Sequence, residues 1–218
     1  MTSSLTPGYR RLAALIALIG WMALAGQLVL SLVYFAQDGG TPAEALWRYC
    51  GYFTITTNLL VAFVMTAAAR GTVLLPRLGE ASLLAGATLA ILFVGVVYHL
   101  LLAAPAVDWL HWVVDRSLHY LVPALALLLW LAGAPKAALG FRDPLRWALY
   151  PIFYLIYSWS RGALDGWYPY SFLDVGRLGY GQALIAALGL AGGFIAAGLA
   201  LVLLARLLTR LRPDAAIP

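Results

Sequence analysis

Charge and cysteine are scarce in this 218-residue chain. Only 11% of its residues are Asp, Glu, Lys or Arg, and Cys50 is its one cysteine. A single cysteine excludes an internal disulfide and any metal cluster built from cysteines. The chain also lacks a phosphate-binding glycine loop, a Gly-x-Ser-x-Gly elbow and a His-Glu-x-x-His helix. These absences leave nucleotide chemistry and the common serine and zinc hydrolase motifs without support.

Apolar residues make up most of the chain instead. They account for 63% of the sequence, and the mean hydropathy is +0.88. A membrane-spanning helix needs about 20 mostly apolar residues, and flanking Trp and Arg can anchor a shorter one. We therefore expect an all-α, polytopic bundle of six transmembrane helices, a single integral membrane domain over residues 1–218. The six predicted spans cover residues 12–35, 49–69, 82–102, 117–134, 146–160 and 183–208.

The basic residues predict the orientation of this bundle. Ten of them lie at the termini and in the second and fourth loops, against four in the other loops, Arg48, Arg116, Arg161 and Arg177. The positive-inside rule then places both termini in the cytoplasm, and it accounts for the net charge of +5 without a nucleic-acid partner. The apolar stretch continues to Phe35, too long for a signal peptide, so an uncleaved helix is expected. One lysine against 13 arginines is typical of a GC-rich bacterium, so we expect the bacterial plasma (inner) membrane.

The few polar residues of the apolar runs collect toward one face of the predicted bundle. Ionisable groups in or beside hydrocarbon are costly, so a convergent set is a functional-site hypothesis. Once the helices are oriented, the set at the outer face comprises Thr54, Asn58, His99, Asp115, Arg116, His119, Arg161 and Asp165.

Two pairs in this set have helical spacing. Thr54 and Asn58 are four residues apart and share a helix face, as do Asp115 and His119. A carboxylate at that spacing can hold the imidazole in one tautomer and raise its basicity. The alternative is structural: Thr and Asn often join helices by hydrogen bonds, and an interfacial His can bond a loop carbonyl.

These residues allow two catalytic arrangements. In the first, Thr54 is a nucleophile, His119 its general base and Asp115 the group that orients the base. In the second, the three histidines of the chain, His99, His111 and His119, lie around the third loop with Asp108 and Asp115, and a zinc ion bound by histidines and an acid activates water. Their spacings match no metal motif, so we expect no metal and no other cofactor.

An aromatic stripe reaches the same face. Tyr150, Tyr154, Tyr157 and Arg161 recur at i, i+4, i+7 and i+11, a spacing that is typical of packing between helices but also suits a binding surface. The segment Gly166-Trp167-Tyr168-Pro169-Tyr170 follows as a stiff aromatic turn that is suited to form a lid or to rest in the headgroup layer. The candidate substrate-binding residues are Tyr154, Tyr157, Trp167 and Tyr168.

At these positions the chain resembles the bacterial Pr6Pr membrane proteins, and more remotely the eukaryotic androgen-induced gene 1 and androgen-dependent TFPI-regulating proteins. The resemblance rests on Tyr52-Phe53-Thr54-Ile55-Thr56-Thr57-Asn58-Leu59-Leu60, Tyr98-His99-Leu100-Leu101, Leu118-His119-Tyr120-Leu121-Val122-Pro123 and the Gly166–Tyr170 segment. The eukaryotic members hydrolyse fatty acid esters of hydroxy fatty acids with a threonine nucleophile and a histidine. The resemblance implies that Thr54 and His119 fill these roles, with Thr56 and Thr57 as competing nucleophiles.

The expected function is therefore a membrane-embedded lipid-ester hydrolase that acts near the outer leaflet on a hydrophobic ester substrate. Asn58, His99 and Arg161 are the candidates to stabilise the oxyanion or to bind a fatty-acid carboxylate. A non-enzymatic membrane protein that binds lipid or a partner is the alternative, and a metal-dependent membrane hydrolase is the second alternative. No nucleic-acid partner is expected, and the sequence does not indicate an oligomeric state.

Overall fold

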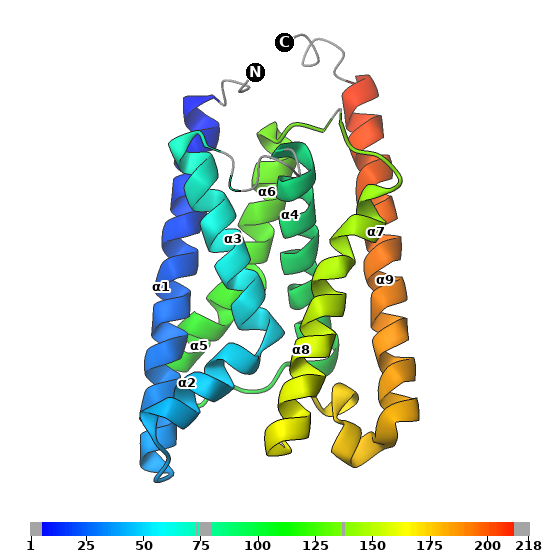
Figure 1. Ribbon diagram of the computed structural model, residues 1–218. Coiled ribbons are helices and arrows are strands. Elements are labelled where there is room, and N and C mark those ends of the chain that lie inside the picture. Colours follow the sequence, from blue (N-terminus) through cyan, green and yellow to red (C-terminus); the bar gives the residue numbers. More distant parts are fainter. Residues whose placement is uncertain (1–5, 73, 75–79, 137, 212–218) are drawn as a thin grey trace.

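A computed structural model describes residues 6–72, 74, 80–136 and 138–211. All regular structure in these ranges is helical, which confirms the predicted all-α class. The elements are α1 (Pro7–Gln37), α2 (Pro42–Gly51), α3 (Phe53–Arg70), α4 (Glu80–Val97), η2 (Tyr98–Leu102), α5 (Trp109–Arg116), η3 (Ser117–Leu121), α6 (Val122–Gly133), α7 (Asp143–Trp147), α8 (Leu149–Asp165), η4 (Ser171–Leu173) and α9 (Val175–Leu211). Figure 1 shows the long helices side by side, with the first turn of α1 and the last turn of α9 at the same end of the bundle.

Within the described residues, five helical stretches are long and apolar enough to cross a membrane: Pro7–Gln37, Phe53–Arg70, Glu80–Leu102, Trp109–Gly133 and Val175–Leu211. These stretches are consistent with a membrane protein. The predicted span at 146–160 corresponds to α8, which has 17 residues. That length falls short of the about 20 residues that a helix perpendicular to the bilayer needs.

The predicted second span, 49–69, is wrong at its start. The helix breaks at Tyr52, whose backbone is extended, and α2 precedes the break as a separate helix. A continuous helix would bond the carbonyls of Cys50 and Gly51 to later backbone N–H groups. Here they accept hydrogen bonds from the hydroxyls of Tyr157 (3.0 Å) and Tyr154 (2.8 Å) instead. The apolar run gives no sign of this break, because the two tyrosines that bond the free carbonyls come from α8, far along the sequence.

The core is densest between α1, α3, α4 and α6. Trp130, Met65 and Ile91 are almost completely buried there, and small residues let the helices approach closely. A Cβ added at Gly95 of α4 would lie 2.7 Å from the carbonyl oxygen of His119, so only glycine allows α4 to come this near to η3. This close approach sets the distance between the two helices that carry Tyr98 and His119.

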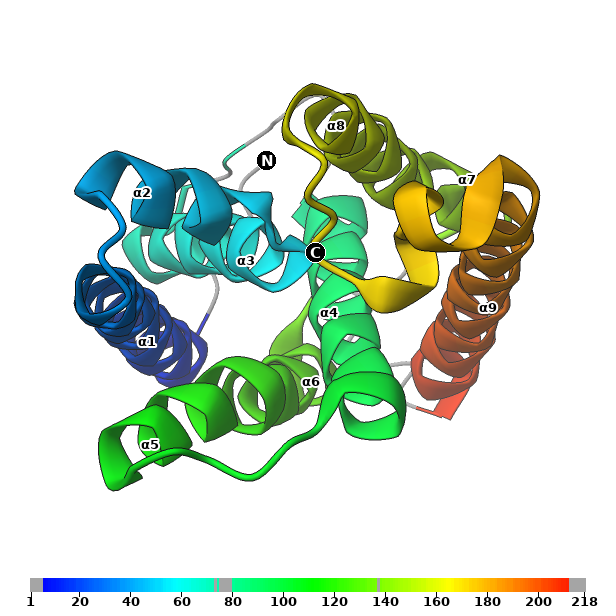
Figure 2. The same cartoon turned by 90° about the horizontal axis from the view of Figure 1, so that it is seen from below.

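At the end opposite the termini, the helices are joined by shorter elements (Figure 2). Here lie α2, α5 and the segment 166–174, which connects α8 to α9. α8 ends at Gly166, whose φ of +73° is in the left-handed region that favours glycine. This end of the bundle holds the polar residues singled out in the sequence.

Candidate functional site

A π-helical turn positions His119. Pro123 has no backbone N–H, so the helix cannot keep regular bonding across residues 118–123. Instead the N–H of Val122 donates to the carbonyl of Ser117, and Ser117–Leu121 forms the π-helix η3. Such single π-helical turns often occur at functional sites. Tyr98 lies in a second π-helix, η2, at the end of α4, so the two facing residues both come from distorted turns.

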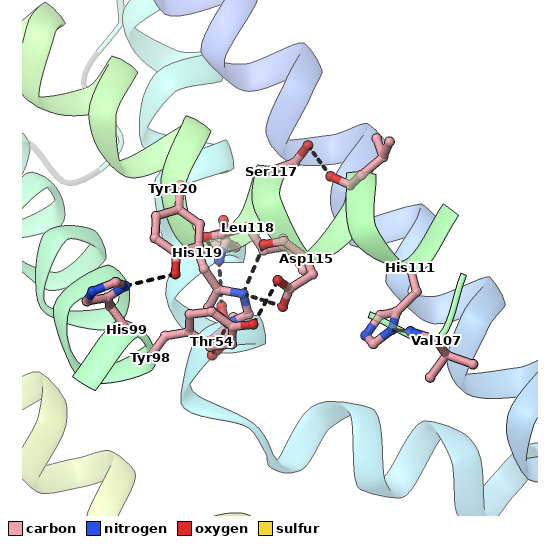
Figure 3. Close-up of polar contacts among 12 residues, drawn as sticks. Thr54, Tyr98, His99, Val107, His111, Asp115, Ser117, Leu118, His119 and Tyr120 are labelled. Atoms are coloured by element: carbon pink, nitrogen blue, oxygen red, sulfur yellow. Dashed lines mark hydrogen bonds and ion pairs between the residues drawn. The ribbon is translucent and has the colours of Figure 1, made fainter. Parts of the chain in front are cut away.

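Thr54, His119 and Asp115 form a contiguous chain of polar contacts (Figure 3). The Oγ1 of Thr54 lies 3.3 Å from Nε2 of His119. On the other side of the ring, Nδ1 lies 3.0 Å from the carbonyl oxygen and 3.1 Å from the carboxylate Oδ1 of Asp115. Both of these neighbours are acceptors, so the Nδ1–H tautomer is favoured. Nε2 is then left unprotonated and facing the threonine hydroxyl, as a general base requires.

Tyr98 completes this arrangement. Its hydroxyl donates to Oδ2 of Asp115 at 2.8 Å, and its ring stacks on the imidazole of His119 with centroids 3.7 Å apart and planes 15° apart. The carboxylate is held from one side and the imidazole from its face, so neither can rotate freely. Tyr98 was not among the predicted site residues, although it precedes His99, which was.

Asn58 joins the two helices that carry Thr54 and His119. Its side chain is fully buried, and its Nδ2 donates to the carbonyl of Thr54 at 2.9 Å and to that of Leu118 at 3.4 Å. In a π-helix the carbonyl of Leu118 would accept from residue 123, but a proline there has no proton to give. Asn58 supplies the missing donor, so it fixes Thr54 against the turn that contains His119.

The break before α3 leaves the backbone N–H of Thr54 without a helical partner. The first N–H groups of a helix have no intrahelical acceptor. The N–H of Thr54 points instead at the hydroxyl oxygen of Tyr170, 3.4 Å away. Tyr170 is 8% exposed and belongs to the segment 166–174. It was not predicted as a site residue, although the Gly166–Tyr170 segment was expected to form a lid.

Thr54 borders an apolar cavity. The cavity has a volume of about 100 Å³ and extends from Thr54 and Tyr170 toward the Phe93–Phe194 ring pair. None of the described residues that line it is charged. They come from α3, α4, η2, α8, η4, α9 and the segment before η4: Phe53, Thr54, Phe93, Val94, Val97, Leu102, Pro151, Ile152, Tyr154, Leu155, Tyr170, Phe172, Leu173, Ala187, Leu190, Ala191 and Phe194. A wall of this kind suits a hydrocarbon chain whose polar end lies beside the hydroxyls of Thr54 and Tyr170.

The two competing threonines contact a different group. The Oγ1 atoms of Thr56 and Thr57 lie 3.1 Å and 3.0 Å from the hydroxyl of Tyr150. Thr56 also donates to the carbonyl of Phe53 at 3.1 Å. Of the three threonines, Thr54 is therefore the one whose hydroxyl contacts His119.

The three histidines do not converge on one point. Figure 3 shows His99 and His111 on opposite sides of His119. His99 is exposed, with Nδ1 3.2 Å from the hydroxyl of Tyr120, and Nδ1 of His111 accepts the N–H of Val107 at 3.1 Å. Within the described ranges, no three or more His, Cys, Asp or Glu side chains come together in a group that could hold a metal ion. The arrangement with three histidines around zinc has no geometric support.

Arg161, a candidate to stabilise the oxyanion or to bind a carboxylate, is not among the residues that line the cavity. It is 4% exposed, donates to the hydroxyl of Tyr157 at 2.6 Å and to the carbonyl of Trp47, and stacks 3.7 Å over the Trp47 ring. His99 is not among the lining residues either, and its ring contacts the hydroxyl of Tyr120 on η3. Helical spacing gives the side of α8 on which Arg161 lies, but α2 packs against that side.

Of the four aromatic residues proposed to bind substrate, Tyr154 alone lines the cavity. Tyr157 bonds the end of α2, Trp167 packs edge-on against Tyr52 at 5.4 Å, and Tyr168 fills the space beside Gly162. Their contacts join α8 and the segment 166–174 to neighbouring elements, away from the cavity. A role of these three residues in substrate binding stays a prediction.

Asp165 ties this outer cluster together. Burial would raise the pKa of its carboxyl, but the N–H of Trp167 and the indole of Trp47 donate to it, and Arg48 and Arg161 lie nearby. The net effect lowers the pKa below its ordinary value, so the carboxylate stays ionised at neutral pH. The cluster holds α2 against the end of α8.

The site thus consists of a hydroxyl, an imidazole and a carboxylate, each in contact with the next, at the edge of an apolar cavity. Comparison with models of protein families, with curated proteins and with solved structures finds no match to this chain.

Proposed function

We propose that this protein is a membrane-embedded hydrolase of lipid esters. Thr54 is the nucleophile, His119 the general base and Asp115 the residue that orients the base. The observation that carries the proposal is the 3.3 Å contact between Oγ1 of Thr54 and Nε2 of His119, with Asp115 at Nδ1 and an apolar cavity alongside. A threonine hydroxyl is a weak nucleophile by itself, and an adjacent base held by a third group is the usual means of activating it.

In the proposed reaction, the acyl chain of the ester occupies the cavity and its carbonyl carbon lies at Oγ1 of Thr54. Nε2 of His119 takes the hydroxyl proton as Oγ1 bonds to the carbonyl carbon, and later gives that proton to the departing alcohol. Water then attacks the acyl-threonine with His119 again as base, and releases the acid. The uncharged cavity wall supports an acyl chain as the bound part of the substrate.

The decisive experiment is labelling of the purified protein with a long-chain fluorophosphonate, followed by mass-spectrometric mapping of the modified residue. The proposal requires the label on Thr54, together with hydrolysis of a long-chain ester in detergent micelles. Labelling elsewhere would contradict the role of Thr54. Membership of the Pr6Pr family, and fatty acid esters of hydroxy fatty acids as substrates, remain part of the proposal.

We also propose six membrane crossings, both termini in the cytoplasm and the site near the outer leaflet of a bacterial inner membrane. The first turn of α1 and the last turn of α9 lie at the same end of the bundle, which an even number of crossings requires (Figure 1). Five long apolar stretches supply five crossings, and α7 with α8, which run beside α9, supply the sixth. Of the ten basic residues counted as cytoplasmic, Arg77 and Arg212 lie outside the described residues.

The orientation is tested by reporter fusions. Fusions after residue 218 and before residue 1 are expected to behave as cytoplasmic, because most basic residues lie near that end. Alkaline phosphatase and green fluorescent protein, fused in turn to each end, distinguish the two sides. Phosphatase activity from either terminus would contradict both the orientation and the outer-leaflet site.

Filling the cavity is expected to select against long acyl chains. Ala191 lines the cavity, so Ala191→Phe should lower turnover of a long-chain ester by about tenfold or more, the loss expected when a bound hydrocarbon group loses about 1.4 kcal/mol or more of its binding energy. Turnover of an acetyl ester should change little. Ala197→Phe, at an exposed position of the same helix, is the matched control. Equal turnover of both esters in Ala191→Phe would place the acyl chain elsewhere.

A non-enzymatic lipid-binding protein is the second candidate. The apolar cavity and the 9% exposure of Thr54 favour it, because both also suit a site that holds a lipid without reacting with it. This candidate predicts that a lipid co-purifies with the protein, that Ala191→Phe displaces it, and that no ester is hydrolysed by the wild type. Turnover that depends on Thr54 would exclude it.

A further inference from the structure

The proposed reaction places a negative charge on the carbonyl oxygen of the substrate, and none of the residues predicted to stabilise it is available. Both Nδ2 protons of Asn58 are directed at backbone carbonyls. His99 is exposed and bonds Tyr120. The guanidinium of Arg161 donates to Tyr157 and Trp47, away from the cavity. The donors must therefore come from other groups at Thr54.

Two donors lie directly at the nucleophile. The first is the backbone N–H of Thr54, which is free of helical bonding because α3 begins at Phe53. The hydroxyl of Tyr157 occupies the carbonyl of Cys50, the acceptor that this N–H would reach if the helix were continuous. The helix N-terminus adds a partial positive charge at this position. These features match an anion-binding position at the start of a helix.

The second donor is the hydroxyl of Tyr170. Its oxygen accepts the N–H of Thr54 at 3.4 Å, and its side chain lines the cavity. The hydroxyl also interacts with the side chain of Thr54 and with the hydroxyl of Tyr154, whose own proton is donated to the carbonyl of Gly51. A carbonyl oxygen that enters the cavity beside Thr54 can accept the Tyr170 proton in place of these neighbours.

We propose that the N–H of Thr54 and the O–H of Tyr170 together form the oxyanion site, which makes Tyr170 a further catalytic residue. The proposal rests on the hydrolase function proposed above. When Oγ1 of Thr54 bonds to the carbonyl carbon, the π-electron pair of the carbonyl moves onto its oxygen. This oxyanion accepts both hydrogen bonds. When the pair returns, the bond to the alcohol oxygen breaks, and His119 protonates that oxygen.

The existing contact is compatible with entry of an oxyanion. A distance of 3.4 Å is long for a hydrogen bond between N–H and a hydroxyl, so little is lost when a charged oxygen takes the place of this contact. A charged acceptor then gains two shorter, stronger bonds. Burial raises the pKa of Tyr170 to about 12, so the hydroxyl retains the proton that it must donate throughout the neutral range.

Tyr170→Phe tests the proposal, since it removes the hydroxyl and keeps the ring. Loss of one oxyanion donor typically lowers kcat by about 10²- to 10³-fold. We expect a loss of that size, with KM for a long-chain ester nearly unchanged and with weaker inhibition by a long-chain boronate, which forms a tetrahedral adduct. Inhibition by the fatty-acid product, which is planar at carbon, should be unaffected. Tyr180→Phe, at an exposed tyrosine of α9, is the control.

A kcat within about threefold of wild type, with unchanged boronate inhibition, would overturn the inference, since a lost donor costs at least about 10²-fold. In that case hydrolysis by the wild type would still stand, so the proposed function would survive. A wild type that hydrolyses no ester would overturn both proposals together.

A second measurement keeps the inference testable if Tyr170→Phe does not fold. Incorporation of 3,5-difluorotyrosine at position 170 preserves shape and lowers the pKa of the phenol. Its activity should then fall at an alkaline pH at which the unmodified protein is still active, because an ionised phenol cannot donate to an oxyanion. Identical pH profiles of the two proteins would contradict the role of Tyr170.

Discussion

Thr54→Ala and His119→Ala are each expected to lower hydrolysis of a long-chain ester by at least about 10³-fold, and the double variant should be little worse than either single one. The reason is that the two groups act as a unit: without the base the hydroxyl is not activated, and without the hydroxyl the base has no proton to take. The contact of 3.3 Å between Oγ1 and Nε2 is the geometric basis of this expectation. The measurement is kcat/KM in detergent micelles, with folding checked for each variant.

Matched controls for this experiment are offered by the same helix. Thr56→Ala and Thr57→Ala remove hydroxyls that contact Tyr150, so they should retain most of the activity. Thr54→Ser keeps a hydroxyl at the reacting position and should retain part of it. Full activity in a well-folded Thr54→Ala protein would reject Thr54 as the nucleophile. If Thr57→Ala lowered the activity as much as Thr54→Ala does, the loss would reflect a role of the α3 threonines in folding. It would then not indicate a specific role of the Thr54 hydroxyl.

Asp115→Ala is expected to lower kcat by about 10- to 100-fold, a loss typical of removing a group that orients a functional histidine. The loss should be smaller than that of His119→Ala, because the backbone carbonyl of Asp115 also lies 3.0 Å from Nδ1 and remains in the variant. What disappears is the negative charge that stabilises the protonated imidazole. The measurement is kcat for a long-chain ester in detergent micelles, with folding checked for the variant.

Two further variants make this prediction specific. Tyr98→Phe leaves the carboxylate in place and removes one hydrogen bond to it, so its effect should be smaller than that of Asp115→Ala. Asp38→Asn, at an exposed residue that ends α1, removes a negative charge far along the sequence from the site and should leave turnover unchanged. Wild-type kcat in Asp115→Ala would show that the backbone carbonyl alone orients His119.

Helix formation and the local pairs of the site could be predicted from the sequence. The apolar runs predict the long helices, because a chain in hydrocarbon must satisfy its backbone hydrogen bonds within each segment. The spacing of four residues between Asp115 and His119 predicts their contact, since such residues are neighbours on any helix. The same rule places Asn58 beside the carbonyl of Thr54.

The break at Tyr52 and the π-helical turn could not be predicted in this way. Both depend on hydrogen bonds from distant residues: Tyr154 and Tyr157 bond the end of α2, and Asn58 bonds the carbonyl of Leu118. Apolar periodicity carries no information on such partners. The predicted second span accordingly began too early.

Which residues belong to the site also depends on the tertiary structure. His99 and Arg161 lie at the predicted end of the bundle, but depth along a helix does not tell which neighbour a side chain faces. Packing turns His99 toward Tyr120 and Arg161 toward Trp47, whereas Tyr98 and Tyr170 reach Asp115 and Thr54.

The sequence by itself thus determined an all-helical, apolar chain with a polar set near one end, because composition and local spacing act within a single helix. The tertiary structure decided that Thr54 meets His119, 65 positions away along the chain. That contact depends on how closely α3, α4 and η3 pack. Gly95 lets α4 approach η3 closely, and Asn58 donates hydrogen bonds to the carbonyls of Thr54 on α3 and Leu118 on η3. Contacts between helices arise from shape and from unpaired backbone groups, and neither is visible in the periodicity of one segment.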